Sequence, residues 1–226
     1  MPFEHMRPIQ TIETEGDGIE SFFLWIQRNT RLLGIGVALI VVAALGFWFY
    51  LRSAEIKRLN AERGLNQAKQ SMAAGNTALA QTDLDRVSSR YPGTPAGAQA
   101  AMILAQLHYD AGRFAEGVQA LRAYETRAAA RENLAAIWSL IADGHFGQDN
   151  AAEAAAAYRK AAEATPHAGA SSLYLAKAAR AFMAAGNDGE AQALWESLLK
   201  DPDAIAVHNE ATMRLGELTA KPAGQS

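Results

Sequence analysis

The chain of 226 residues contains no cysteine. Disulfide bonds, thiol catalysis and cysteine-ligated metal centres are therefore excluded. The sequence also lacks a glycine-rich phosphate loop, a Walker motif and a G-x-S-x-G nucleophile elbow. Its histidines are scattered, without the spacing of a metal-binding or His–carboxylate motif: His5, His108, His145, His167 and His208. These absences predict a protein that is not an enzyme and that needs neither a cofactor nor a metal.

An excess of positive charge is missing as well. From residue 52 onward the chain has 18 Lys and Arg against 19 Asp and Glu, which gives a net charge of −1. A nucleic-acid-binding domain would carry a basic patch or stripe. The charge balance therefore gives no electrostatic reason to expect a nucleic-acid partner.

One stretch lacks charge altogether, LLGIGVALIVVAALGFWFYL at residues 32–51. A signal peptide, a buried core helix and a membrane span are the three candidates. About 20 apolar residues cross a bilayer core of about 30 Å, whereas a signal peptide has about 7–15 close to a basic N-terminus. Here 31 residues come first, including Glu13, Glu15, Asp17 and Glu20. Since the stretch is apolar on every side, unlike a soluble core helix, we predict one uncleaved transmembrane helix.

The flanks of the span have the composition of a membrane interface. Arg28 and Arg31 precede it, and Arg52, Lys57 and Arg58 follow it. Aromatic side chains gather at membrane boundaries, and we expect five of them at the interface: Phe22, Phe23, Trp25, Trp48 and Tyr50. The span contains no ionisable side chain, so it offers no haem or chlorophyll ligand and no proton or ion path.

The predicted domains divide at the ends of the span. Residues 1–18 are expected to be a disordered acidic tail, because they show no apolar period. Residues 19–52 contain the span, preceded by either an interfacial helix or the first turns of the anchor. Residues 53–221 are expected to form one soluble domain, which is long enough to bury a sizeable core.

Internal repeats organise this soluble domain. The turns SMAAGNTALAQ, HYDAGRFAEGVQ and AFMAAGNDGEAQ resemble one another, and their glycines, Gly75, Gly112 and Gly186, are 37 and 74 residues apart. The remaining register falls at Asp149, inside FGQDNAAEAAAAY. The spacing predicts repeats of 37 residues with turns near 75, 112, 149 and 186.

Each repeat is predicted to be a pair of helices. In the third, ENLAAIWSLIADGHF is followed by the turn GQDN and by AAEAAAAYRKAAEATP, which ends at Pro166. Alanine-rich runs favour helix, and Gly, Asn and Asp interrupt them. The predicted fold is all-α, a single N-terminal transmembrane helix followed by a solenoid of helical hairpins. After Pro202, residues 204–220 are expected to form a capping helix.

The pattern of small and large residues resembles the tetratricopeptide repeats. The third repeat matches that family at Trp138, Ala142, Glu153, Ala154, Tyr158, Ala161 and Pro166, and the fourth at Ala179, Phe182, Gly186, Glu190, Ala191 and Trp195. The second repeat departs from it, with Gly117 in place of alanine at the tightest helix contact. Because the period of 37 exceeds the usual 34, the resemblance implies a tetratricopeptide-like scaffold for protein partners.

The whole layout resembles the ancillary subunits of the bacterial SecYEG translocon, of the YfgM type. The shared features are a short acidic cytoplasmic tail, a segment like IESFFLWIQRNTRLL, one span ending in aromatic residues and a periplasmic tetratricopeptide-like domain. The sequence-level part covers residues 19–70. The resemblance implies an accessory factor that links the translocon to periplasmic chaperones.

Two features predict opposite orientations in the membrane. Within twenty residues of the span, the N-terminal side has two basic residues and the C-terminal side has five: Arg52, Lys57, Arg58, Arg63 and Lys69. The positive-inside tendency alone would keep the repeats in the cytoplasm, although long domains cross largely regardless of charge. Following the resemblance, we expect a single-pass protein of the bacterial inner membrane with a cytoplasmic N-terminus and periplasmic repeats.

Partners are expected on the concave face, which the first helix of each hairpin lines in tetratricopeptide stacks. Eight positions on these helices are candidates: Met72, Met102, Gln106, Tyr109, Asp143, Phe146, Arg180 and Met183. Methionine and aromatic side chains can adapt to apolar helices or unfolded segments. The register Met72, Tyr109, Phe146 and Met183 would also suit the core between repeats, where large apolar residues at helical spacing are usually found, so both interpretations stay open. His108 and His145 share one repeat position and are expected to be packing residues.

Two functional hypotheses follow. In the first, the protein is an accessory or chaperone-linking factor beside the inner-membrane protein translocon. In the second, it is a structural subunit that stabilises another multi-subunit inner-membrane complex, respiratory or photosynthetic. The first predicts transient binding in a groove and the second a large permanent interface, which a conspicuously apolar outer surface would favour.

Overall fold

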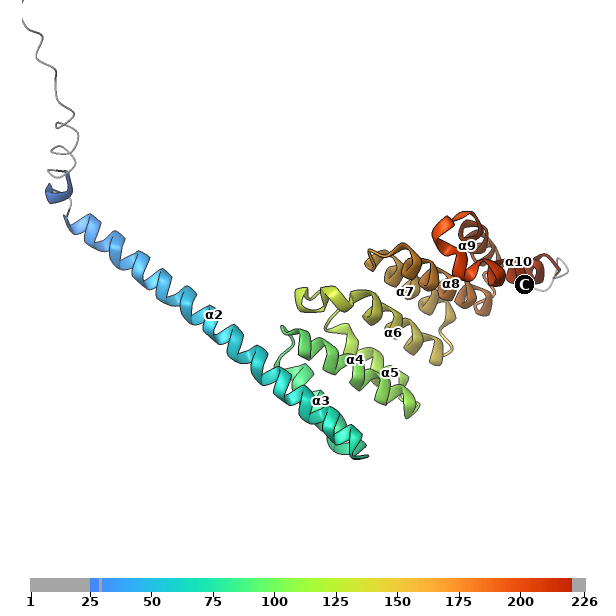
Figure 1. The fold of residues 1–226 in the computed structure, drawn as a ribbon, viewed down its shortest axis with the longest axis horizontal. Coiled ribbons are helices and arrows are strands. Elements are labelled where there is room, and N and C mark those ends of the chain that lie inside the picture. Colours follow the sequence, from blue (N-terminus) through green and yellow to red (C-terminus); the bar gives the residue numbers. More distant parts are fainter. Residues whose placement is uncertain (1–24, 29, 221–226) are drawn as a thin grey trace, which may run out of the picture. The chain divides into compact units, whose positions relative to one another are not determined.

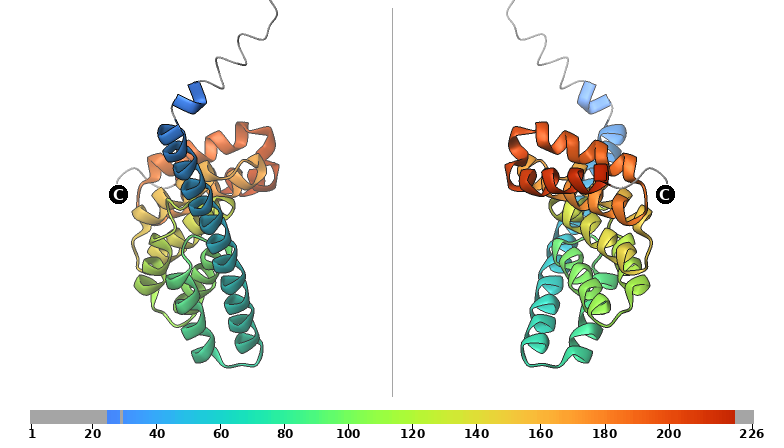
Figure 2. Two further views of the ribbon diagram at one scale, coloured as in Figure 1. Left: turned by 90° about the vertical axis from the view of Figure 1, so that its left-hand side faces the viewer. Right: turned by 90° about the vertical axis from the view of Figure 1, so that its right-hand side faces the viewer.

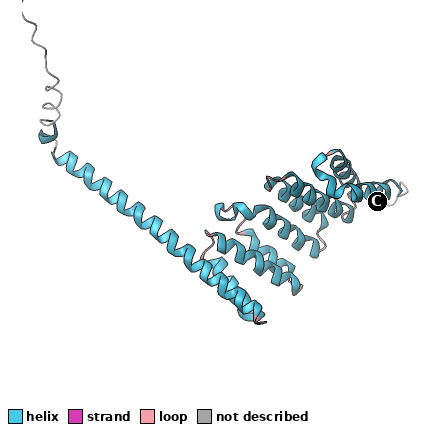
Figure 3. Ribbon diagram, viewed as in Figure 1, coloured by secondary structure: helices cyan, strands magenta, loops and turns pink. Residues whose placement is uncertain are grey.

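A computed structural model describes residues 25–28 and 30–220 of the chain. Every regular element in these residues is helical, and none is a strand (Figure 3). The fold is therefore all-α, as predicted. The chain divides into two compact units, Met1–Ala54 and Glu55–Ser226.

The first unit contains a candidate membrane span. Residues 25–28 are helical, and helix α2 runs over Thr30–Ala73. Within the residues described, α2 alone has a stretch long and apolar enough to cross a bilayer. The apolar side chains near its second boundary are exposed, with Trp48 at 63% and Tyr50 at 69%. Exposed aromatic side chains of this kind fit an interface between water and lipid.

The second unit is a series of helices that pack on their neighbours in chain order (Figures 1 and 2). The helices after α2 are α3 (Thr77–Arg90), α4 (Pro95–Asp110), α5 (Phe114–Arg122), α6 (Leu134–Gly147), α7 (Ala151–Ala164), α8 (Ala168–Ala184), α9 (Asp188–Lys200) and α10 (His208–Ala220). Two short 3₁₀ helices interrupt the series, η1 at Ala128–Asn133 and η2 at Pro202–Val207.

Four turns join helices by the same hydrogen bonds. At the first, Gly75 N–H donates to the carbonyl of Met72 and Asn76 N–H to that of Ser71, both at 2.9 Å. This pair of bonds is the Schellman motif, which needs a left-handed residue after the helix. Gly75, Gly112 and Gly186 have φ of 73–77°, and Asp149 has φ of 61°. The shared motif explains why a turn recurs with Gly, Gly, Asp and Gly at a spacing of 37 residues.

Alanine dominates the core of the repeats. One buried cluster joins the end of α2 to α3 and α4, and it includes Ala61, Ala68 and Ala100, all fully buried. A second cluster extends from α4 to α10 and contains larger side chains such as Trp195 and Tyr124. Small side chains at helix crossings let the backbones approach closely, while the large ones fill the space between hairpins.

The C-terminal helix begins differently from the sequence-based expectation of one helix over 204–220. A 3₁₀ helix, η2, precedes α10, and Ala204 inside it has non-helical φ and ψ of −95° and 15°. The side chain of Asp201 caps η2 by accepting a hydrogen bond from Asp203 N–H at 2.9 Å. A local side-chain bond of this kind competes with the start of an α-helix.

Candidate protein-interaction surface

The four residues of the 37-residue register occupy equivalent backbone positions near the ends of first helices. The carbonyls of Met72, Tyr109, Phe146 and Met183 each accept the N–H of the left-handed turn residue three positions later. Their side chains have different surroundings. Met72 is 37% exposed and Phe146 is 46% exposed, whereas Tyr109 and Met183 pack against the larger core cluster.

Tyr109 is a core residue between two hairpins. Its hydroxyl donates to the carbonyl of Leu140 at 2.9 Å. A Cβ placed on Gly117 would lie 2.7 Å from Tyr109 Cδ1, and one on Gly144 would lie 2.8 Å from Tyr109 Cζ. Both contacts are too close for a real Cβ, so the ring fits only because glycine stands on both sides. This contact explains the departure of Gly117 from the family pattern. Burial raises the pKa of Tyr109 well above its usual range.

Two other positions on α4 have unequal exposure. Met102 is half-buried and packs against the larger core cluster. Gln106 is exposed, and its amide donates to Asp110 at 2.9 Å within the same helix. A bond between exposed residues four apart on a helix is weak, so Gln106 remains available to a partner.

Asp143 belongs to a polar cluster on α6, α7 and α8. The Tyr158 hydroxyl donates a short hydrogen bond to Asp143, and Lys177 Nζ lies 3.4 Å from the same carboxylate. Lys177 also lies 5.1 Å from the centre of the Tyr158 ring. Burial, and then the hydrogen bond to Asp143, raises the pKa of Tyr158 well above its usual range. These contacts hold the half-buried carboxylate of Asp143 in place between α6, α7 and α8.

Arg180 is paired within the chain. Its guanidinium donates to both oxygens of Glu210, at 2.6 and 2.7 Å, and so ties α8 to α10. Glu210 also lies 3.8 Å from Arg214. The hydrogen bond from Arg180 is the main cause that lowers the pKa of Glu210. Bidentate pairs of this kind are strong and oriented, so Arg180 helps to hold the last helix, α10, on the repeats.

Sequence reasoning missed the partners of these charges. Lys177 lies 34 residues after Asp143, and Glu210 lies 30 residues after Arg180. The sequence does contain a signal for these pairs, because the first charged residue of each is followed about one repeat later by a residue of opposite charge. The predicted surface therefore contains exposed uncharged positions, namely Gln106, Met72 and Phe146, an exposed position that is ion-paired, Arg180, and half-buried positions that hold the repeats together.

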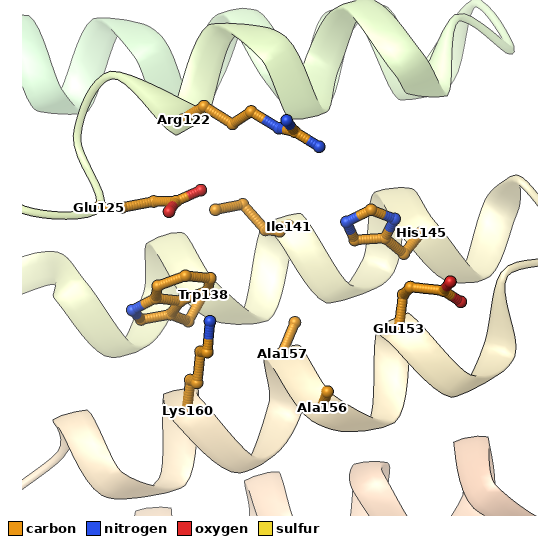
Figure 4. Close-up of a pocket in the computed structure, with 9 residues that line it drawn as sticks. All are labelled: Arg122, Glu125, Trp138, Ile141, His145, Glu153, Ala156, Ala157 and Lys160. Atoms are coloured by element: carbon orange, nitrogen blue, oxygen red, sulfur yellow. The ribbon is translucent and has the colours of Figure 1, made fainter.

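A pocket of ≈ 390 Å³ lies among α5, α6 and α7 (Figure 4). Lys160 extends over the Trp138 ring, with Nζ 4.2 Å from the ring centre. Arg122 reaches toward His145, whose Nδ1 is buried and has no hydrogen-bond partner (Figure 4). Burial, and then Arg122, lowers the pKa of His145. Glu125 also lines the pocket, so the pocket contains both positive and negative side chains. No sequence motif marks this pocket.

The two histidines of one repeat position are both half-buried. His108 Nδ1 accepts a hydrogen bond from Arg113 Nε at 3.1 Å, and burial is the main cause that lowers its pKa. In the described part of the chain, no three His, Asp or Glu side chains come together in a group that could hold a metal ion. His108 is therefore a half-buried side chain bonded to Arg113, and His145 a half-buried side chain that lines the pocket.

The comparisons with known proteins concern the N-terminal part of the chain. The family model of the tetratricopeptide repeat-like domain matches residues 24–142. No curated protein matches the chain. The matched residues are more than half of the chain and extend from the candidate span into α6. The chain therefore belongs to the tetratricopeptide repeat-like domain family.

Proposed function

We propose that the protein is a membrane-anchored scaffold that acts as an accessory or chaperone-linking factor at the inner-membrane protein translocon. The observation that carries this proposal is the combination of a tetratricopeptide repeat-like match with an apolar helical stretch at its start. Repeats of this family support protein–protein interaction, and the apolar stretch would hold them at a bilayer. The resemblance of the layout to YfgM-type subunits supports the translocon as the assembly.

The domain arrangement belongs to the same proposal. Residues 1–18 form an acidic cytoplasmic tail, residues 19–52 the interfacial segment and the span, and residues 53–221 the periplasmic repeats. Trp48 and Tyr50, both exposed, lie at one membrane boundary, and Trp25 lies at the other. Phe22 and Phe23, placed by the sequence at the same interface, lie outside the described residues.

Partner proteins bind the exposed positions of the first helices. Phe146 supplies the largest exposed apolar side chain of the eight candidates, and Met72 and Gln106 are also accessible. An exposed aromatic side chain on a scaffold is an effective anchor for a partner, because it buries a large area with few rotatable bonds.

One observation favours the second candidate, a structural subunit of another inner-membrane complex. Three large apolar side chains on the C-terminal elements are exposed, Leu173 at 50%, Ile205 at 73% and Met213 at 53%. Exposed apolar side chains outside a span fit a permanent interface better than a transient one.

Purification from membranes in a mild detergent distinguishes the two candidates. The full chain should co-purify with translocon subunits, and the translocon should be lost or weakened in Phe146→Ser. A stable, stoichiometric set of respiratory or photosynthetic subunits would instead establish the second candidate and reject the first.

A further inference from the structure

A second pocket, of ≈ 280 Å³, lies between the end of α2 and the end of α3, within the unit Glu55–Ser226. Arg63 lines it from α2, and Arg86 and Arg90 line it from α3. We call it the arginine pocket. The side-chain amides of Asn60 and Gln67 add hydrogen-bond donors to its wall.

The arginine pocket carries positive charge that the protein neutralises only in part. None of its lining residues is an acid. Arg86 donates through Nη2 to the buried carboxylate of Asp83 at 2.6 Å, but its side chain is still 54% exposed. In the described part of the chain, Arg63 and Arg90 form no ion pair with a carboxylate. The Arg90 guanidinium also lies 6.0 Å from the centre of the Tyr91 ring, but this contact does not neutralise its charge. Two guanidinium groups and part of a third can therefore meet an anion.

A close helix contact brings these arginines together. A Cβ placed on Gly64 would lie 2.6 Å from Val87 Cγ2, so α2 and α3 approach as closely as they do because residue 64 has no side chain. Arg63 precedes Gly64, and Arg86 precedes Val87. The backbone positions of Arg63 and Arg86 are therefore fixed by two packed helices and not by a loop.

We infer that the arginine pocket binds a phosphate group. A phosphate monoester carries about −1.5 to −2 charges at pH 7 and three strong acceptor oxygens. Arginine recognises such oxygens with paired N–H donors. One carboxylate has two oxygens and a single charge, so it would leave a guanidinium in the arginine pocket without a partner. A phosphate monoester therefore matches the charge of two free guanidinium groups better than a carboxylate does.

The other pocket of the repeats provides an internal comparison. It also has two basic side chains, Arg122 and Lys160, but Glu125 and Glu153 line it as well. Those carboxylates would repel an anion at close range. Of these two pockets, we therefore expect phosphate to bind only in the arginine pocket. This inference does not depend on the partner proposed for the scaffold.

Two sources could supply the phosphate, a lipid headgroup and a soluble phosphate. The chain contains a stretch fit to cross a bilayer, so phospholipid headgroups are available to it at high local concentration. A phospholipid headgroup is a phosphodiester with one charge and two free oxygens, so more than one headgroup would be needed to occupy the arginine pocket, whereas one soluble phosphate would suffice. The experiment is built to tell the two sources apart.

The test uses the full chain in an uncharged detergent, with inorganic phosphate as the probe and its ³¹P line width as the measure of binding. At an ionic strength held constant with chloride, the line should broaden saturably. Arg63→Gln combined with Arg90→Gln should lower the affinity roughly tenfold or more, because two charge-assisted contacts are lost. Both arginines are exposed, so circular dichroism should show unchanged helicity.

Arg122→Gln is the matched control, because Arg122 is also exposed and also lines a pocket. It should leave phosphate affinity unchanged. Absence of broadening in the unchanged protein, or equal broadening in the double variant, would overturn the inference. Displacement of phosphate by a glutamate-rich peptide of equal charge would also overturn it, since the arginine pocket would then recognise an acidic protein segment.

Reconstitution in bilayers identifies the source. The protein is placed in phosphatidylcholine bilayers, or in the same bilayers with phosphatidylglycerol added, and titrated with inorganic phosphate. Loss of phosphate binding in the anionic bilayers, seen both in the unchanged protein and in Arg122→Gln, would assign the arginine pocket to lipid headgroups. Equal binding in both bilayers would assign it to a soluble phosphate.

Discussion

Tyr109 and Phe146 lie one repeat apart and occupy the same position in their helices, but one side chain is packed in the core and the other is exposed. Tyr109 packs between Gly117 and Gly144, whereas Phe146 is 46% exposed. The difference arises from the neighbouring residues, because two glycines leave space for the Tyr109 ring and, among the described residues, no such pair lies beside the Phe146 ring. A partner can therefore reach Phe146 without unpacking the repeats.

Separate serine substitutions test this difference. Tyr109→Ser should cost about 3–5 kcal/mol, as expected for the loss of a packed aromatic side chain. Phe146→Ser should cost about 1 kcal/mol, since only part of its ~1.5–3 kcal/mol of burial energy is present. Thermal melts of the two variants give the comparison. Equal losses in melting temperature would mean that Phe146 belongs to the core and is no partner site.

His108 and His145 predict how stability depends on pH. Burial lowers the pKa of both below the ordinary value of 6.5. The unfolded chain then binds protons that the folded chain does not hold, so stability decreases as pH falls through 6.5. His145→Gln should flatten this decrease in a series of melts, and His167→Gln, at an exposed position, should leave it as it is. An unchanged slope in His145→Gln would contradict the assignment.

At the scale of elements, the turns set the period of the fold. Three of the four turns place glycine in the left-handed region, but the third places Asp149 there with φ of 61°. An L-residue pays about 1–2 kcal/mol for this conformation, although aspartate tolerates it better than most. The third turn is therefore the strained member of the series.

Exchanging the turn residues should change stability in opposite directions. Asp149→Gly should raise the melting temperature. The gain in unfolding free energy should stay below about 1–2 kcal/mol, because glycine also loses more entropy on folding. Gly112→Ala should lower it, since alanine would have to adopt φ of 73°. Thermal melts measure both. A gain from Gly112→Ala would show that the turn relaxes to another conformation.

The helical hairpins could be predicted from the sequence because their signals are local. Gly75, Gly112 and Gly186 mark turns through their backbone freedom, and alanine-rich runs favour helix wherever they occur. The sequence could not decide whether Tyr109 is a groove or a core residue, because its burial depends on glycines 8 and 35 residues away in sequence. The arginine pocket has the same origin, since Arg63 and Arg90 line one pocket only because α2 and α3 approach closely at Gly64 and Val87.

At the scale of the whole molecule, one apolar stretch should account for all membrane binding. The large side chains of residues 39–51 are exposed to more than 45%, which fits contact with lipid. A chain that starts at Ser53 should therefore remain in solution without detergent and show strong helical circular dichroism. If this shortened chain sediments with vesicles of phosphatidylcholine, a second membrane-binding surface exists and the single-anchor account is wrong.

The orientation of the repeats is the central claim, because the translocon proposal requires them outside the cytoplasm. Protease added to intact spheroplasts measures it directly, with antibodies against each end of the chain to follow the fragments. We predict that the protease digests the repeats beyond residue 52 and spares the N-terminal tail. Full protection of the repeats in intact spheroplasts, with digestion only after lysis, would place them in the cytoplasm and contradict the proposed function.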